Sequence, residues 1–361
     1  MTVDNLQGRI ALLVLYDVSD EIRLEELQHL IGGKPLAPTF KHPAPEYVRF
    51  ERPPVIEPLD PISLPTGEHF TASVQYYDYG VVSVLLHYQF SGNWRQLEAL
   101  AGNWISGNVF DDLSRKIVER KVEAIAPAMD KRYDHLLSED YCIVHLHTIP
   151  DVTDAAALLQ KHGADISQIV RGETSPLSES ERNEILQAHM SYYPNDLVVI
   201  GWNAAFLYDT EAGAETTVRL LEYANSQLLQ FRHYDDLLTR ELRDVYRFLE
   251  RKRGLIAGWR MRPAATRLHT VMLDVTELTE HTNNALKFVG DMFSARLYKL
   301  GAARIGVNDY QVLVQEKLHT ADDLYDFMIE QFHQARGFVL EFIVVLILII
   351  ELFFLFQGQK P

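Results

Sequence analysis

Two histidines separated by one residue are the side chains best placed to do chemistry in this sequence. His145 and His147 lie in the apolar stretch 141–149, whose composition is typical of a strand. Because side chains alternate along a strand, both imidazoles point to one face, which suits two ligands of a metal ion. Two ordinary, partly buried histidines are the favoured interpretation, because any of the 50 carboxylates could be the third ligand. We therefore expect neither a metal nor another cofactor, and we name no catalytic residue.

The common motifs of nucleotide and hydrolase chemistry are absent from the sequence. It has no G-x-x-x-x-G-K-[ST] loop, no G-x-S-x-G and no H-E-x-x-H. Gly301 and Gly306 belong to a stretch without lysine that is better explained by a helix–helix turn. The single cysteine, Cys142, can form neither an intrachain disulfide nor a cysteine-based zinc site. A protein without catalysis is favoured, and the alternative is an enzyme of unknown reaction with its site near His145 and His147.

A cluster of basic residues lies between positions 247 and 267 of a chain whose formal net charge is −16. We call this set the basic elbow; it consists of Arg247, Arg251, Lys252, Arg253, Arg260, Arg262 and Arg267. Its cations can oppose a helix dipole in solvent or meet anionic lipid headgroups. A contact with RNA or the ribosome, with Trp259 as a stacking face, is the rival use. The overall negative charge argues against nucleic acid as a general partner.

Residues 338–356 form the most apolar segment, with 17 apolar residues among 19. As a helix it spans about 28 Å, close to the roughly 30 Å of a hydrocarbon core. The apolar residues contribute about −5 to −10 kcal/mol to insertion, and each of the two glutamates costs up to about 3 kcal/mol. The residues expected to carry the membrane anchor are Phe338, Glu341, Phe342, Ile343, Leu346, Ile350, Glu351 and Phe356.

The two glutamates of this segment are ten residues apart, which places them about 80° apart around a helix. Both could therefore face an oligomer interface, and the alternative is a buried core helix in a soluble oligomer. The N-terminal residues show neither a signal-peptide nor a transit-peptide pattern. We expect a single-pass protein of the cytoplasmic membrane, with its soluble part on the cytoplasmic side.

The first half of the chain alternates predicted strands with predicted helices, which favours a mixed α/β domain over residues 1–210. Strands are expected at 10–16, 74–90, 141–149 and 197–202, and helices at 20–30, 94–104, 113–125 and 151–162. A further helix is expected to start at a capping box at 178–181 and to end at 189. The proline-rich segment 35–65 is expected to be an irregular surface connection.

The second half has helical periodicity, so a stalk of long antiparallel helices is predicted over residues 211–337. Helices are expected at 217–230, 234–252 and 264–300, and a last one after a turn near 301–306. A heptad seam is predicted in the third helix; it comprises Leu268, Val271, Val275, Leu278, Thr282, Ala285, Val289 and Met292. The seam can pack within one subunit or form a coiled coil between subunits. The fold class is therefore α+β: a mixed α/β domain, a helical hairpin stalk and a transmembrane helix at 338–356.

Two segments of the chain resemble a known family. The ending 340–346, Leu-Glu-Phe-Ile-Val-Val-Leu, followed by Ile350-Glu351, resembles the Leu-Glu, apolar stretch, Glu pattern that ends the "required for meiotic nuclear division", or YagE-type, family. Asp78-Tyr79-Gly80-Val81-Val82 is similar to an early strand of that family's domain, and the layout from 234 to the ending is similar too. The resemblance implies a self-associating protein on an internal membrane, without established catalytic residues. Mitochondrial members are associated with support of organellar translation.

This chain departs from those members in two respects. It lacks a transit peptide, and Phe206-Leu207-Tyr208-Asp209-Thr210 stands where a Trp-containing acidic motif is expected. The departures favour a bacterial-type protein that faces the cytoplasm. We predict a membrane-anchored, self-associating scaffold or accessory protein, whose partners are the membrane and further copies of itself.

Overall fold

The computed structural model describes residues 5–32, 34–35, 48–50, 52–107, 109–251, 261–284, 286–288 and 292–358. The chain divides into two compact units. Unit 1 comprises Met1–His233 and Glu280–Tyr310, and unit 2 comprises Tyr234–Thr279 and Gln311–Pro361. Unit 1 holds the sheet and unit 2 is helical.

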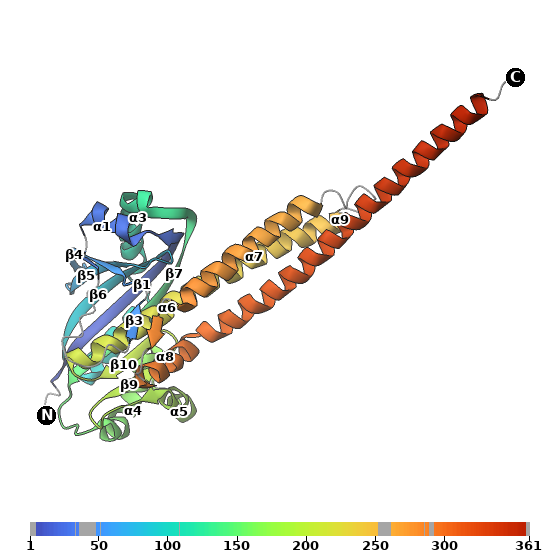
Figure 1. Ribbon diagram of the computed structural model, residues 1–361. Helices are drawn as coiled ribbons and strands as arrows, with labels where there is room; N and C mark the ends of the chain where they lie inside the picture. Colours follow the sequence, from blue (N-terminus) through green and yellow to red (C-terminus); the bar gives the residue numbers. More distant parts are fainter. Residues whose placement is uncertain are drawn as a thin grey trace. The chain divides into compact units, whose positions relative to one another are not determined.

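A mixed sheet forms the centre of unit 1 (Figure 1). In the described part of the chain it has nine strands in the order β2-β4-β5-β6-β1-β7-β10-β9-β8. The strands are β1 Leu6–Ile22, β2 Lys34–Pro35, β4 Val55–Ser63, β5 His69–Tyr76, β6 Val81–Gly92, β7 Met129–Thr148, β8 His189–Met190, β9 Leu197–Ile200 and β10 Ala204–Tyr208. The pairing of β10 with β7 is parallel, and the other pairings in the sheet are antiparallel. A separate ladder joins β3 Val48–Phe50 to β11 Leu286–Phe288.

Strand β1 lies between β6 and β7 and is buried on both faces. One face carries Leu12 and Val14, which belong to the main hydrophobic core. The alternate residues Leu13 and Leu15 are also buried, but they lie outside that core on the opposite face of the sheet. The near-continuous apolar run of this strand therefore reflects cover on both sides of the sheet.

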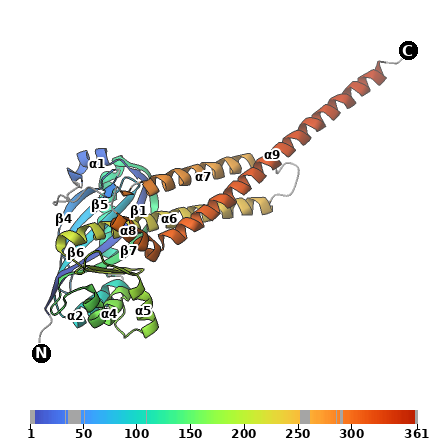
Figure 2. The ribbon, with the colours of Figure 1, turned by 60° about the horizontal axis from the view of Figure 1, so that its bottom comes forward.

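Five α-helices supply the layer over the core face. They are α1 Leu24–Ile31, α2 Trp94–Ser106, α3 Asp111–Ile125, α4 Ala155–Arg171 and α5 Glu179–Gln187; the short η1 Ala126–Ala128 follows α3. Helix α2 begins at a capping box in which Asn93 and Gln96 satisfy each other's backbone N–H groups, and Ser178 caps α5. Figure 2 shows α2, α4 and α5 side by side, and Trp94, Leu158 and Ile185 of these helices enter the same core.

The opposite face of the sheet is covered by the first part of α6 Glu211–Arg251 and by α8 Met292–Ile305. The hydroxyl groups of Ser226 on α6 and Tyr79, in the turn before β6, are 2.7 Å apart. Gly301 of α8 lies against Leu221 of α6, where a Cβ atom would come within 3.2 Å of the leucine side chain. The glycine therefore allows the two helices to approach closely.

Unit 2 is a bundle of the second part of α6, most of α7 Met261–Asn284 and most of α9 Val307–Gln357. Helix α7 runs antiparallel to α9, because Arg262 lies over the ring of Phe332 while His269 stacks on Tyr325. Both helices carry buried residues spaced seven positions apart: Met261, Leu268 and Val275 on α7, and Val314, Ala321 and Met328 on α9. Ala265 of α7 is buried as well.

The observed architecture is a mixed sheet with helices, an N-terminal α/β domain and a C-terminal helix of 51 residues. The strands and helices expected in the first half are present, but the element predicted at 74–90 is two strands, β5 and β6. Gly80 lies in the turn between them with φ of +80°. The proline-rich segment 35–65 contains β4, which departs from the expected irregular connection.

Two predictions for the second half were also wrong. The helices expected at 217–230 and 234–252 form one helix, α6, because no glycine or proline separates them. The helix expected at 264–300 is divided by β11 into α7 and α8. Met292, expected in the heptad seam, is 76% exposed on α8. The seam side chains of Thr282, Ala285 and Val289 lie outside the described residues.

Candidate membrane-anchoring segment

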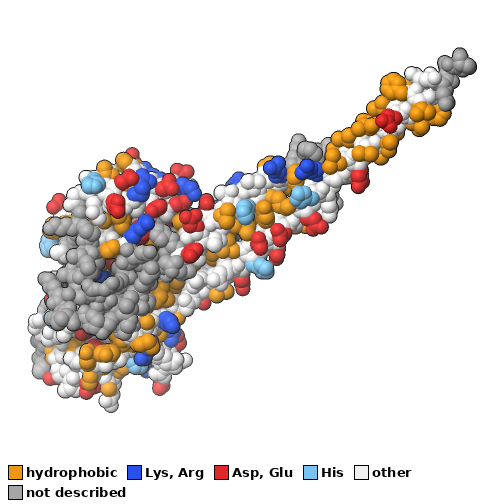
Figure 3. Space-filling view, in the orientation of Figure 1, with side chains coloured by type: hydrophobic (Ala, Val, Ile, Leu, Met, Phe, Trp, Pro, Cys, Tyr) orange, Lys and Arg blue, Asp and Glu red, His pale blue; other side chains and the backbone are white. Residues whose placement is uncertain are grey.

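Helix α9 changes character along its length. Its first part alternates buried and exposed positions, and its buried positions recur every seven residues up to Met328. From Leu340 to Gly358 every residue is exposed, and nearly all are apolar. Figure 3 shows hydrophobic side chains dominating this distal part of the helix. The helix is long and apolar enough to cross a membrane, and no part of its most apolar window is buried.

The residues predicted to carry the anchor are all exposed, and all but Phe338 lie between Leu340 and Gly358. The exposed fractions of the aromatic side chains run from 50% at Phe338 to 70% at Phe356. Glu341 and Glu351 are exposed as well, and neither makes a hydrogen bond or ion pair within the described residues. The segment is therefore an apolar cylinder that is interrupted by two acidic side chains.

The structure places only part of the basic elbow. Arg247 lies 3.9 Å from a carboxylate oxygen of Asp244, and Arg267 lies 2.5 Å from one of Glu241. Hydrogen bonding to Glu241 raises the pKa of Arg267, so this guanidinium is charged and already paired. Arg251 ends α6, and its side chain lies outside the described part, as do Lys252, Arg253, Trp259 and Arg260.

Arg262 connects the start of α7 with the approach to the apolar segment. Its guanidinium carbon lies 5.9 Å from the centre of the Phe332 ring, within the range of a cation–π interaction. Phe332 precedes Phe338 by six residues, which is about 9 Å along a helix. At least one basic residue of the elbow is therefore within two helical turns of the apolar segment.

His145 and His147 lie close together, as the strand spacing predicts, with ring centroids 6.3 Å apart. His145 is buried, and its Nε2 lies 2.9 Å from the backbone oxygen of Asp209, so this nitrogen donates a hydrogen bond. Burial lowers the pKa of His145, which favours the neutral imidazole. His147 is exposed and lies 3.0 Å from the Thr148 hydroxyl. Among the described residues, no group of three or more His, Cys, Asp or Glu side chains could hold a metal ion.

A polar network beneath α6 was not predicted from the sequence. Asp17 on β1 is fully buried; its two carboxylate oxygens lie 2.7 Å from Nδ1 of His233 and 2.7 Å from Nε2 of Gln230. The ring of Tyr133 stacks on His233 at a centroid distance of 4.4 Å. Burial raises the pKa of Asp17, and the hydrogen bond to His233 only partly offsets this.

A sequence signal for this network does exist. Between residues 217 and 233, the apolar side chains of α6 cover about two thirds of the helix circumference, and they are buried together with the polar ones. So wide an apolar stripe indicates a helix that is buried on most of its sides, and its polar residues must then find partners inside the protein. The buried polar residues are Thr217, Glu222, Asn225, Ser226, Gln227, Gln230 and His233.

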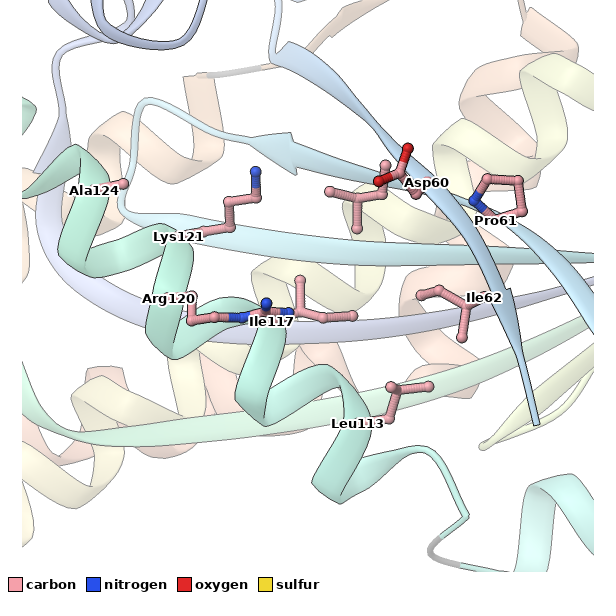
Figure 4. A pocket seen from close by; sticks show the side chains of 9 residues that line it. Asp60, Pro61, Ile62, Leu113, Ile117, Arg120, Lys121 and Ala124 are labelled. Atoms are coloured by element: carbon pink, nitrogen blue, oxygen red, sulfur yellow. The ribbon is translucent and has the colours of Figure 1, made fainter. Parts of the chain in front are cut away.

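A groove lies between strand β4 and helix α3 (Figure 4). Its volume is about 430 Å³, and Ile62, Leu113 and Ile117 are among the apolar side chains that line it. Arg120 and Lys121 supply its basic groups, and Lys121 is paired with Glu57 at 2.6 Å. None of the residues predicted to be functional lines this groove.

Comparison with known proteins identifies an uncharacterised family. The model of the family described as "Uncharacterized protein MJ0711, N-terminal domain" matches residues 7–215. The chain is similar to "Uncharacterized protein MJ0711" of Methanocaldococcus jannaschii, with 19% identity over 207 residues. The match covers 57% of this chain and 63% of that relative, so the chain spans less than two thirds of the relative's length. No solved structure matches.

Proposed function

We propose that this chain, which belongs to the family described as "Uncharacterized protein MJ0711, N-terminal domain", is a membrane-anchored accessory protein that presents its α/β domain to the cytoplasm. The observation that carries the proposal is the fully exposed, apolar stretch of α9 from Leu340 to Phe356. A monomeric soluble protein rarely exposes a continuous apolar surface of this kind. Lipid is the environment that matches a helix with apolar side chains on every side.

The free energy of insertion supports lipid as that environment. The 17 apolar residues of 338–356 contribute about −5 to −10 kcal/mol to the free energy of insertion, and the two glutamates oppose insertion by up to about 6 kcal/mol. At the maximum glutamate cost the sum lies between about +1 and −4 kcal/mol, and insertion is favourable over the whole range when the two glutamates together cost less than about 5 kcal/mol. Glutamates away from the bilayer centre, or with a partner, meet that condition.

Self-association is proposed because the two glutamates lack partners within the described chain. Their side chains lie about 80° apart around α9, so a neighbouring copy of the helix could contact both. Ionisable side chains inside a bilayer usually face other helices and pair there. The experiment is crosslinking in membranes, in which replacing both glutamates by leucine should reduce the crosslinked dimer.

The basic elbow is proposed to lie at the membrane surface. Arg262 lies beside Phe332, about 9 Å along the helix from the start of the apolar segment. Basic residues at this level meet anionic headgroups, and each contributes roughly 1 kcal/mol before screening. The resemblance to the "required for meiotic nuclear division" family adds a finer proposal, which is that the anchored domain supports translation.

The decisive experiment places arginines at the centre of the apolar segment. Leu346→Arg with Ile347→Arg exchanges two favourable residues for two that cost about 2.5 to 3.5 kcal/mol each, a total change of roughly 6 to 8 kcal/mol. The variant should then be released from membranes by carbonate extraction, whereas the parent chain stays in the pellet.

Leu273→Arg is the matched control for this experiment. Leu273 is an exposed leucine of α7, outside the apolar segment, with 56% of its surface accessible. The control chain should remain in the pellet with the parent. A parent chain that carbonate releases, or a double variant that stays in the pellet, would contradict the anchoring proposal.

A further inference from the structure

Unit 1 contains a polar cavity of about 540 Å³ on the face of the sheet that α6 covers. Strands β1, β4, β5 and β6 form one wall, and residues 211–222 of α6 form the other. The polar lining includes Arg9, Gln75, His87, Glu211, Arg219 and Glu222. The volume lies within the range of pockets that bind small molecules, about 300 to 1,000 Å³.

Arg9 is the first unusual group in this cavity. It is half-buried on the central strand β1, and within the described residues it makes no hydrogen bond or ion pair. Burial and the charge of Arg9 lower the pKa of His87 to about 4, so this neighbouring imidazole is neutral near pH 7. Three carboxylates also line the cavity, but none of them makes an ion pair with Arg9, so this half-buried guanidinium lacks the close anion that usually accompanies it.

Glu222 is the second unusual group. Only 1% of its surface is exposed, and its Oε1 is buried without a hydrogen-bond partner in the described part of the chain. Burial raises the pKa of Glu222, and the nearby Ser83, Tyr77 and Arg219 offset this only in part. The guanidinium of Arg219 is itself paired with Glu215 at 2.5 Å. Buried polar atoms without partners are rare in native proteins, and a bound ligand is one explanation for them.

We propose that this cavity binds a small zwitterion, whose carboxylate pairs with Arg9 and whose ammonium group pairs with Glu222. Arg9 supplies a cation without an ion pair, and Glu222 supplies a carboxyl oxygen, Oε1, without a hydrogen-bond partner, which is the pair of groups that such a ligand complements. The lining has two guanidinium groups against three carboxylates, so it repels a polyanion such as a nucleoside triphosphate. His87 adds a buried Nδ1 without a partner, which can bind a further polar group of the ligand.

Isothermal titration calorimetry of the full chain in detergent tests this proposal. Glycine, β-alanine and 4-aminobutyrate carry both charges at increasing separation, whereas acetate, methylammonium and inorganic phosphate present only one kind of charge. At least one of the amino acids should bind saturably, and at least tenfold more tightly than any of the single-charge compounds. Arg9→Gln and Glu222→Gln should each weaken that binding at least tenfold, and Glu25→Gln on the exposed side of α1 should leave it unchanged.

Two controls separate loss of binding from loss of folding. Near-ultraviolet circular dichroism establishes that each variant is folded. A further variant, Ser73→Phe, fills the cavity from β5 without removing either charged side chain. This second variant should also abolish binding. The proposal is overturned if none of the three amino acids binds saturably, or if binding survives all three cavity substitutions. Phosphate binding that requires Arg9 but not Glu222 would also overturn it, because the site would then recognise an oxyanion alone.

Discussion

Replacing Asp17 by alanine should destabilise unit 1 more than any surface substitution. Asp17 is fully buried; its Oδ1 accepts a hydrogen bond from Gln230 over 2.7 Å, and its Oδ2 lies 2.7 Å from Nδ1 of His233. The substitution removes a buried carboxylate that contacts both of these side chains. A broken buried pair costs about 3 to 5 kcal/mol, mainly because the remaining partner is desolvated without compensation. For a domain of this size the midpoint of thermal unfolding should fall by roughly 10 °C.

The net contribution of this pair is smaller than the cost of breaking it. Burial raises the pKa of Asp17, which means that the folded protein disfavours the carboxylate even with His233 beside it. A double-mutant cycle separates the two quantities. Asp17→Ala and His233→Ala should each destabilise, and the double variant should lose at least about 1.5 kcal/mol less than the sum of the single losses.

Urea unfolding followed by tryptophan fluorescence measures this cycle. Trp94 and Trp104 are buried in the core of unit 1, so their emission reports on its unfolding. Glu123→Ala is the control, because Glu123 is exposed and its ion pair with Arg132 lies in solvent; the free energy of unfolding should stay nearly unchanged. Single losses that add to within about 0.5 kcal/mol would refute the argument that the two side chains act as a pair.

Three further predictions concern unit 1. Burial and, second, the nearby Asp165 raise the pKa of Glu98 from 4.5 to about 7. Because the pKa is higher in the folded protein, ionisation of Glu98 lowers the stability as pH rises from about 4.5 to 7. Glu98→Gln should therefore raise the melting temperature at pH 8 but not at pH 4. Burial raises the pKa of Cys142 far above its usual value, so a thiol reagent should label it at least about 100-fold faster in urea than in the native protein. Gly80→Ala should lower the free energy of unfolding in urea by more than about 3 kcal/mol, because φ is +80° and a Cβ atom would lie 1.7 Å from the backbone oxygen of Ser19. Gly67 has a φ of +103° but no atom of the described residues near the position of a Cβ, so Gly67→Ala should lower it by only about 1 kcal/mol.

Elements with strong local signals could be predicted from the sequence. Ser178, in the stretch 178–181 where a capping box was expected, caps α5, and the aliphatic run from Ile10 to Tyr16 lies within β1. In both cases neighbouring residues indicate the backbone conformation, through a cap or through a short, continuous apolar run. The candidate membrane span in α9 was equally predictable, because it follows from the length and composition of the segment alone.

Features that depend on distant segments could not be predicted. Pro58 and Pro61 argue against a strand, yet β4 accommodates them because, among the described residues, it is paired with β2 only at its first two residues and is otherwise an edge strand. A break in its ladder falls between Leu59 and Ile62, next to the second proline. The buried pair of Asp17 and His233 joins residues more than 200 positions apart. Neither local propensity nor spacing carries information about such pairings.

Helix α9 shows how periodicity separates two kinds of apolar helix. Between Val314 and Met328 the buried positions recur every seven residues, and the intervening positions include charged residues, because only one side of the helix packs against protein. From Phe338 the periodicity disappears and apolar residues cover every side. A helix that packs on one side gains nothing from apolar residues on its other sides, whereas a helix in lipid is solvated by hydrocarbon all round. The loss of the seven-residue period, together with the rise in apolar content, is therefore what distinguishes residues 338–356, a candidate membrane span, from residues 311–335.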